Sequence, residues 1–162
     1  MKRNIDVSLK AGFSLLLLAA ASLWLWLGVP EYMLYREQYQ LFLFSRDYFM
    51  QRISVPGGFA DWLGEFVGQF YYVPLYGALL SGCVLTLVQV FLALACRHGN
   101  NGGASFVLAA VPSVLYIGAF GDENILFSFA AAMLLTSGFV LTDSFVCLLY
   151  TSPSPRDTER SR

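Results

Sequence analysis

The acidic side chains are the residues of this sequence that could do chemistry, and they are unevenly placed. Seven of them fall in the polar stretches between apolar runs: Glu31, Glu37, Asp47, Asp61, Glu65, Asp122 and Glu123. A carboxylate held in apolar surroundings takes up a proton more readily, which suits a general base. The candidates for such a role are Glu31, Glu37 and Asp47 in the first polar stretch, and Asp122 and Glu123 in a later turn.

Each of these carboxylates also has a structural interpretation, which is the stronger one for any of them alone. Charged residues outside a hydrocarbon layer usually face water. Asp61 and Glu65 are expected on the solvated face of a surface helix, and Asp122 and Glu123 suit the start of a helix. Glu37 and Asp47 are harder to explain in this way, because the segment around Glu37 and Asp47 is apolar on most sides.

The remaining reactive residues predict no metal site and no cofactor. Cys83 and Cys96 lie thirteen positions apart in one apolar run, about 20 Å along a helix, and therefore cannot pair. The third cysteine is Cys147, and the sequence has no Cys-x-x-Cys motif. The three cysteines are therefore expected to act as small apolar side chains rather than as a metal or redox site. The only histidine, His98, is expected at a membrane edge, away from the acidic residues.

Composition places the chain among membrane proteins. It is 57% hydrophobic and 13% charged, with a mean hydropathy of +0.59, whereas about a quarter of a soluble domain is charged. The net charge is −1, and no basic stripe is available for phosphates, so we expect the lipid bilayer as a partner and no nucleic acid.

The elements that must position the carboxylates are therefore spanning helices. We predict an all-α membrane protein with four transmembrane helices, at about residues 12–29, 73–96, 104–120 and 125–142. Pro112 interrupts the third, which is tolerable where neighbours satisfy the freed carbonyl. A signal peptide cut near Ala19–Ser22 is the rival interpretation of the first run, but the run continues through Leu23–Val29.

The basic flank of the first run sets the predicted orientation. Lys2, Arg3 and Lys10 precede it, which favours a cytoplasmic N-terminus in a bacterial inner membrane, with residues 31–72 on the outer face and both ends inside.

Residues 31–72 are too polar to cross a bilayer and too aromatic for a plain loop. We predict two amphipathic interfacial helices there, at about 32–53 and 58–71, separated by Pro56–Gly58. At helical spacing, the second carries its bulky apolar residues on one face: Phe59, Trp62, Leu63, Phe66 and Phe70. Gly64 and Gly68 form a Gly-x-x-x-Gly pair that would let another backbone come close.

The last residues differ in character from the rest. Cys147–Asp157 resembles one reading frame through a transposase-type sequencing adapter. This predicts a native N-terminal fragment over 1–146 and a non-native, disordered tail over 147–162, with a C-terminal part of the same protein missing.

Two resemblances bear on function. Arg36–Phe49, Pro56–Phe66, Gln69–Tyr72 and the Asp122–Asn124 turn resemble a bacterial family of uncharacterised multispanning membrane proteins, which implies architecture and no assigned activity. The order of span, outer loop with surface helices, and further spans is more weakly similar to GT-C class glycosyltransferases, which use polyprenyl-phosphate sugars. That resemblance implies a base among Glu31, Glu37 and Asp47, a second acidic group at Asp122 or Glu123, and only in that case a divalent cation.

The sequence therefore predicts an integral multispanning membrane fragment of unknown activity. The alternatives are the N-terminal part of such a glycosyltransferase, or a transporter or envelope-complex subunit. No predicted span carries a buried charge, which disfavours an ion-coupled transporter, whereas the proline-interrupted third run favours one.

Overall fold

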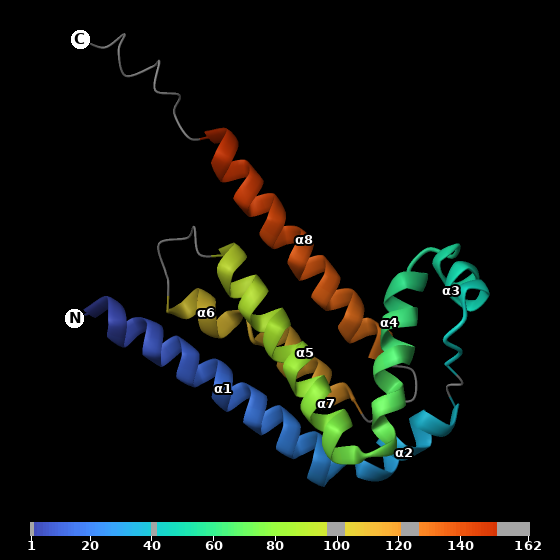
Figure 1. Cartoon of the computed structure of the whole chain (residues 1–162). Coiled ribbons are helices and arrows are strands. Elements are labelled where there is room, and N and C mark those ends of the chain that lie inside the picture. The colour runs from blue at the N-terminus through green and yellow to red at the C-terminus, as the bar shows by residue number, and fades with distance from the viewer. Residues whose placement is uncertain (1, 40–41, 97–102, 121–126, 152–162) are drawn as a thin grey trace, which may run out of the picture.

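The described part of the chain is built from helices alone, as expected. The computed structural model describes residues 2–39, 42–96, 103–120 and 127–151, and no strand occurs in these ranges. The elements, in chain order, are α1 (Lys2–Gly28), α2 (Pro30–Tyr39), α3 (Arg46–Ile53), α4 (Gly58–Gly68), the 3-10 helix η1 (Gln69–Tyr72), α5 (Pro74–Ala95), α6 (Ala104–Leu108), α7 (Val111–Ala119) and α8 (Phe127–Thr151) (Figure 1). The all-α prediction is confirmed for these residues.

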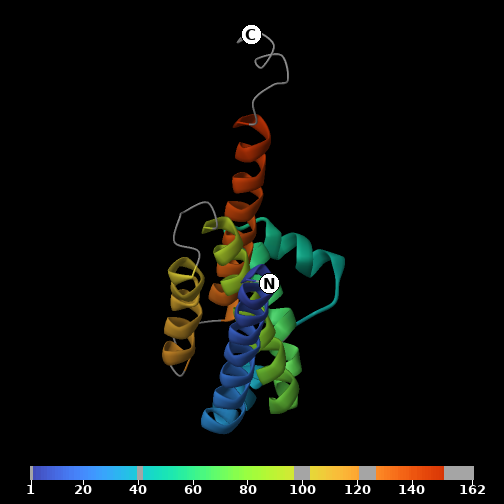
Figure 2. The same cartoon turned by 90° about the vertical axis from the view of Figure 1, so that its left-hand side faces the viewer.

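Three helices are long and apolar enough to cross a membrane. The qualifying segments are Asp6–Gly28 of α1, Pro74–Ala95 of α5 and Phe127–Cys147 of α8. The 22 residues of α5 extend about 33 Å, which matches a hydrocarbon core of about 30 Å. α5 packs against both α1 and α8 and is the central helix of this group (Figures 1 and 2).

The predicted interruption of the third apolar run at Pro112 is confirmed, and the run forms two short helices rather than one helix of spanning length. α6 ends at Leu108 and α7 begins at Val111, with Pro112 in the first turn of α7. Proline lacks the N–H that a continuing helix needs, but it suits a first turn, so the break falls just before it. Ala104–Ala119 together form an apolar segment shorter than a full span.

The first surface helix is also divided, so the prediction of one helix over 32–53 is wrong. α2 runs to Tyr39 and α3 starts at Arg46. Ser45 has extended backbone and its hydroxyl accepts the N–H of Tyr48 at 3.2 Å, which makes it the N-cap of α3. The two helices differ in burial, since α2 buries Met33 and Arg36 whereas α3 has no fully buried residue.

α2, α3 and α4 gather at the end of the molecule where α1 ends and where α5 and α8 begin (Figure 1). We call α2, α3 and α4 the platform. Within it, Gly57 takes a left-handed backbone (φ +82°) between α3 and α4, and a Cβ on Gly58 would overlap the carbonyl of Arg52. Only glycine fits this corner, which folds α4 back along α3.

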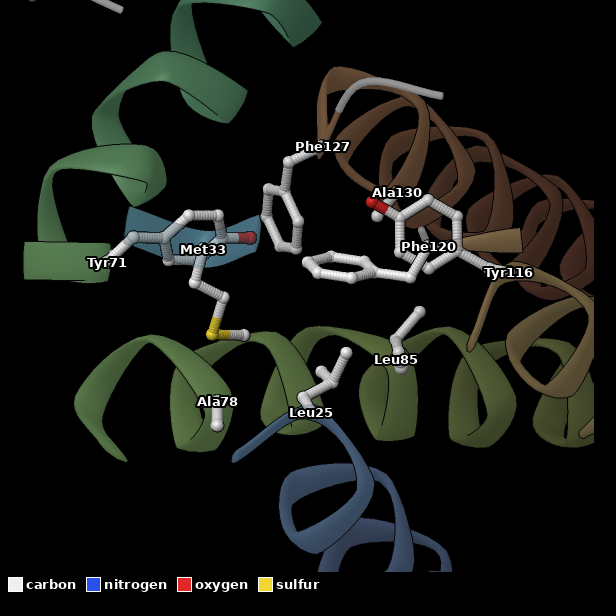
Figure 3. Close-up of a cluster of buried hydrophobic side chains, with 9 residues drawn as sticks. All are labelled: Leu25, Met33, Tyr71, Ala78, Leu85, Tyr116, Phe120, Phe127 and Ala130. Atoms are coloured by element: carbon white, nitrogen blue, oxygen red, sulfur yellow. The ribbon is translucent and has the colours of Figure 1, made fainter. Parts of the chain in front are cut away.

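The hydrophobic core lies where the platform meets the long helices. Figure 3 shows its members, which come from α1, α2, η1, α5, α7 and α8 together with Phe120: Leu25, Met33, Tyr71, Ala78, Leu85, Tyr116, Phe120, Phe127 and Ala130. The rings of Tyr71 and Tyr116 each meet Phe120 and Phe127 edge to face, with centroids 5.9 to 6.5 Å apart.

Several polar side chains buried between the long helices are hydrogen-bonded, although the buried Ser22 hydroxyl has no partner in the described structure. The Ser14 hydroxyl donates to Gln89 Oε1 at 2.9 Å, and Gln89 Nε2 donates to the Phe106 carbonyl at 3.4 Å. Ala110 N–H bonds to Val107 rather than to Phe106, so Gln89 serves a carbonyl freed by the break after α6. Ser113 Oγ likewise donates to the Leu85 carbonyl at 2.8 Å. Hydrogen bonds from neighbouring helices thus satisfy polar groups of the interrupted segment, as a lipid environment without water requires.

α8 starts at Phe127 and continues to Thr151. It therefore extends beyond the predicted end at 142 and enters the first five residues of the segment predicted to be a disordered tail. Residues 152–162 lie outside the described ranges, as do His98, Asp122 and Glu123.

Candidate functional site

Glu65 is the most enclosed carboxylate in the described part of the chain. It lies on α4 with 8% of its surface exposed, which overturns the prediction of a solvated position. Its two oxygens are both used: the Tyr48 hydroxyl donates to Oε2, and Arg52 Nη2 donates to Oε1 in an ion pair. A buried carboxylate needs such partners to offset the loss of water.

Tyr48 and Arg52 are positioned by one turn of α3. They are four residues apart, so they share a helix face, and Arg52 Nε donates to the Tyr48 hydroxyl at 3.2 Å. The guanidinium also lies 5.4 Å from the centre of the Tyr48 ring. The three side chains form a closed triad across the α3–α4 corner.

The surroundings of the triad keep both Tyr48 and Arg52 protonated. Loss of solvent and the hydrogen bond to Glu65 raise the pKa of Tyr48 above its ordinary value of 10.0. The hydrogen bond to Tyr48 raises the pKa of Arg52 above its ordinary value. Tyr48 therefore stays protonated and donating, and Arg52 stays charged, throughout the neutral range. The triad is a fixed polar clasp rather than a poised acid or base.

An aromatic layer covers the α3–α4 corner beside the clasp. Trp62 stacks on Phe59 and Phe66 at interplanar angles of 11°. It also contacts Phe49 and Phe42, with ring centroids 5.1 and 5.6 Å away. Three rings at the edge of this layer are exposed: Phe44, against Phe42, is 86% exposed, Phe70, against Phe66, is 44% exposed, and Phe59 is 41% exposed. A cluster of exposed aromatic rings is typical of a surface that contacts a membrane or a partner.

A second polar centre lies deeper, at the junction of α2 with the core. Arg36 has 7% of its surface exposed and lies 4.7 Å from the centre of the Tyr32 ring, whose hydroxyl accepts from Arg36 Nη2. Tyr71 is nearby, and its hydroxyl lies 3.1 Å from Ser81 Oγ. Burial raises the pKa of Tyr71. A cation among tyrosine rings can attract an anionic group.

The structure describes three of the five carboxylates that are predicted as candidates for catalysis. Glu31 is exposed in the first turn of α2, and Asp47 is exposed in the first turn of α3. Glu37 is half-buried on α2. No group of three acidic, histidine or cysteine residues in the described ranges could hold a metal ion. Asp122 and Glu123 cannot be placed, because they lie outside those ranges.

Sequence reasoning misses Glu65, Arg36 and the clasp. The four-residue spacing of Tyr48 and Arg52 is a usable signal for a shared face. The pairing of Arg52 with Glu65 is not visible in the same way, because it depends on the angle of the corner at Gly57 and Gly58. Helical spacing over 32–53 places Arg36 on a polar face, whereas in the structure that face of α2 is covered and Arg36 lies against the Tyr32 ring.

Three membrane-length apolar helices, a broken fourth segment and a platform at one end define a helical protein suited to a lipid bilayer. Residues 6–149 match the family of unknown function DUF6057, and the chain belongs to that family. Neither the curated proteins nor the solved structures contain a match to this chain.

Proposed function

We propose that the chain is an integral membrane domain that holds a rigid platform at one surface of the bilayer. α1, α5 and α8 span the lipid, the interrupted segment α6–α7 returns the chain across it between α5 and α8, and the platform rests at the membrane–water interface on the outer face of a bacterial inner membrane. The role proposed for the platform is structural: it presents a fixed aromatic and polar surface, and its buried carboxylate Glu65 is held by Tyr48 and Arg52.

The observation that carries this proposal is the distribution of side chains on the long helices, whose apolar residues face outward and whose polar residues face inward. Large apolar side chains point outward: Leu15, Leu16 and Leu27 of α1 and Phe139 of α8 are 66–71% exposed. Polar side chains of the same region, Gln89, Ser81 and Ser113, are fully buried. Outward apolar residues and inward hydrogen-bonded polar ones are typical of a protein dissolved in lipid.

The orientation is supported by the distribution of charge. Lys2, Arg3 and Lys10 lie at the start of α1, at the end remote from the platform, and short flanks rich in Lys and Arg stay in the cytoplasm. The platform then faces outward.

Membrane extraction tests the proposal. The full chain should stay in the membrane pellet after washing with alkaline carbonate and should enter solution only with detergent. Release by carbonate alone, as a monodisperse helical monomer, would refute it. Two controls are needed: an integral membrane protein with known spans, which stays in the pellet, and a peripheral membrane protein, which carbonate releases.

A glycosyltransferase is the second proposal, and the half-buried position of Glu37 on α2 favours it. A partly enclosed carboxylate is a chemically reasonable general base. In that case Glu37→Gln would abolish transfer of a polyprenyl-phosphate sugar, whereas Glu31→Gln, at an exposed position, would not. Equal activity of the two variants would remove Glu37 from this role.

A further inference from the structure

A groove lies between the N-terminal part of α1 and the start of α6, and these two segments are at the end of the molecule remote from the platform (Figure 1). Its volume is about 410 Å³. Four residues of α1 and three at the start of α6 line it: Asp6, Leu9, Lys10, Phe13, Gly103, Phe106 and Val107. It lies where the apolar part of α1 begins, which is the depth of lipid headgroups in the proposed membrane domain.

The walls of the groove continue the outward apolar surface. Leu9 is 68% exposed and Val107 is 55% exposed. The rings of Phe13 and Phe106 meet edge to face at 5.8 Å across the groove. The segment Ala104–Ala119 that forms one side extends only about 24 Å as helix, less than a hydrocarbon core of about 30 Å. A lipid acyl chain therefore fits this side better than water does.

Two opposite charges lie one helical turn apart in the lining. Asp6 and Lys10 both face the groove, yet they do not pair with each other in the described structure, unlike Arg52 and Glu65. The Lys10 ammonium instead lies 5.8 Å from the centre of the Phe106 ring. An aromatic face that holds the ammonium away from Asp6 leaves each charge available to a ligand.

We propose that this groove binds one phospholipid whose headgroup carries a primary ammonium group. The lipid phosphate meets Lys10, the lipid ammonium meets Asp6, and an acyl chain lies along Phe13 and Phe106. The proposal rests on the membrane insertion proposed above. A headgroup with a phosphate alone would leave Asp6 repelled, and a quaternary ammonium has no N–H to donate to the carboxylate.

Native mass spectrometry of the detergent-solubilised full chain tests this site. The probes are phosphatidylethanolamine, phosphatidylglycerol and phosphatidylcholine with identical acyl chains, and inorganic phosphate as a competitor. The wild type should bind phosphatidylethanolamine about fivefold more tightly than either other lipid, the scale of one partly exposed ion pair. Inorganic phosphate should not compete.

Two variants separate the two contacts. Asp6→Asn should remove the preference for phosphatidylethanolamine, and Lys10→Gln should weaken the binding of all three lipids. Matched controls remove one charge elsewhere: Asp143→Asn on α8 and Arg46→Gln on α3, both exposed, should bind as the wild type does. Circular dichroism and size exclusion establish that each variant is folded.

Several outcomes would overturn the lipid site. They are equal binding of the three lipids by the wild type, an unchanged preference in Asp6→Asn, and displacement of lipid by inorganic phosphate. Failure here is distinguishable from failure of the membrane proposal: a chain that resists carbonate but shows no lipid preference loses only this site.

Discussion

A Cβ on Gly64 of α4 would lie 2.6 Å from the backbone nitrogen of Ser128 in the first turn of α8. α4 therefore touches α8 backbone to backbone, with no side chain between them. This contact attaches the platform to a long helix, and it confirms that the Gly-x-x-x-Gly pair allows close approach at Gly64.

Gly64→Ala should separate α4 from α8. The added methyl group meets backbone, which cannot rotate away, so we expect a loss of about 1–3 kcal/mol in unfolding free energy. Gly118→Ala is the matched control, because nothing lies within 4 Å of the point that its Cβ would occupy. Unfolding by denaturing detergent, followed by circular dichroism, measures both. Equal midpoints for the two variants would show that the contact is not tight.

The ion pair between Arg52 and Glu65 should contribute measurable coupling. The Arg52 side chain is 42% exposed and that of Glu65 is 10% exposed, so solvent screens one partner. A double-mutant cycle with Arg52→Gln and Glu65→Gln should give a coupling of about 1 kcal/mol, between the values of surface and buried pairs. Glu31→Gln, at an exposed position, should change stability little. A coupling of zero would mean that Tyr48 alone holds Glu65.

Tyr48 makes the clasp sensitive to alkaline pH. Its pKa is raised in the folded chain, first by loss of solvent and then by the hydrogen bond to Glu65. The folded state thus holds this proton more tightly than the unfolded state does. The resulting stability is fully present below about pH 10, the value of an unfolded tyrosine, and is lost as pH rises through the raised pKa.

A difference titration detects this effect. The tyrosinate absorbance of the wild type minus that of Tyr48→Phe should show one group that titrates above the ordinary range. Tyr72→Phe serves as the control, because Tyr72 is 73% exposed. A Tyr48 difference curve centred at or below the ordinary value would contradict the enclosed geometry.

Gln89 should be the polar residue of α5 that is most costly to replace. It is fully buried and bridges Ser14 of α1 to the Phe106 carbonyl of α6. Gln89→Leu leaves both partners unsatisfied and should cost about 1 kcal/mol in detergent unfolding. Thr86→Val is the control, because Thr86 bonds only within its own helix, to the Gly82 carbonyl at 2.8 Å. A smaller loss for Gln89→Leu than for Thr86→Val would refute the bridge.

The long helices are predictable because their signal is local and strong. The uncharged run through Leu25 and the 22 residues of α5 are apolar because their surroundings are apolar, not because of a particular contact. Hydropathy alone therefore locates them. The break between α6 and α7 is harder, since Pro112 is compatible with both a kinked span and a helix start. The freed carbonyl of Phe106 is met by Gln89, seventeen residues away, which no local pattern reveals.

The candidate site is less predictable, for a physical reason. Helical spacing correctly joins Asp61 and Glu65 on one face of α4, but it cannot say that α3 folds back over that face. The fold-back depends on the left-handed Gly57 and the crowded Gly58, and the sequence shows these only as a break. Arg52 therefore resembles a surface charge in the sequence, although it pairs with Glu65 across the corner.

Thiol labelling in sealed vesicles tests the central proposal most directly. Cys83 lies exposed near the middle of α5. In a chain whose other cysteines are replaced, it should react with a maleimide only after denaturation in detergent, because a thiol in the hydrocarbon core does not ionise. Asp61→Cys, made in a cysteine-free chain, should react with a charged, impermeant maleimide from the outer face, and Asn101→Cys should not. Reaction of Cys83 with the impermeant reagent in intact vesicles would contradict a lipid-embedded α5 and with it the whole arrangement.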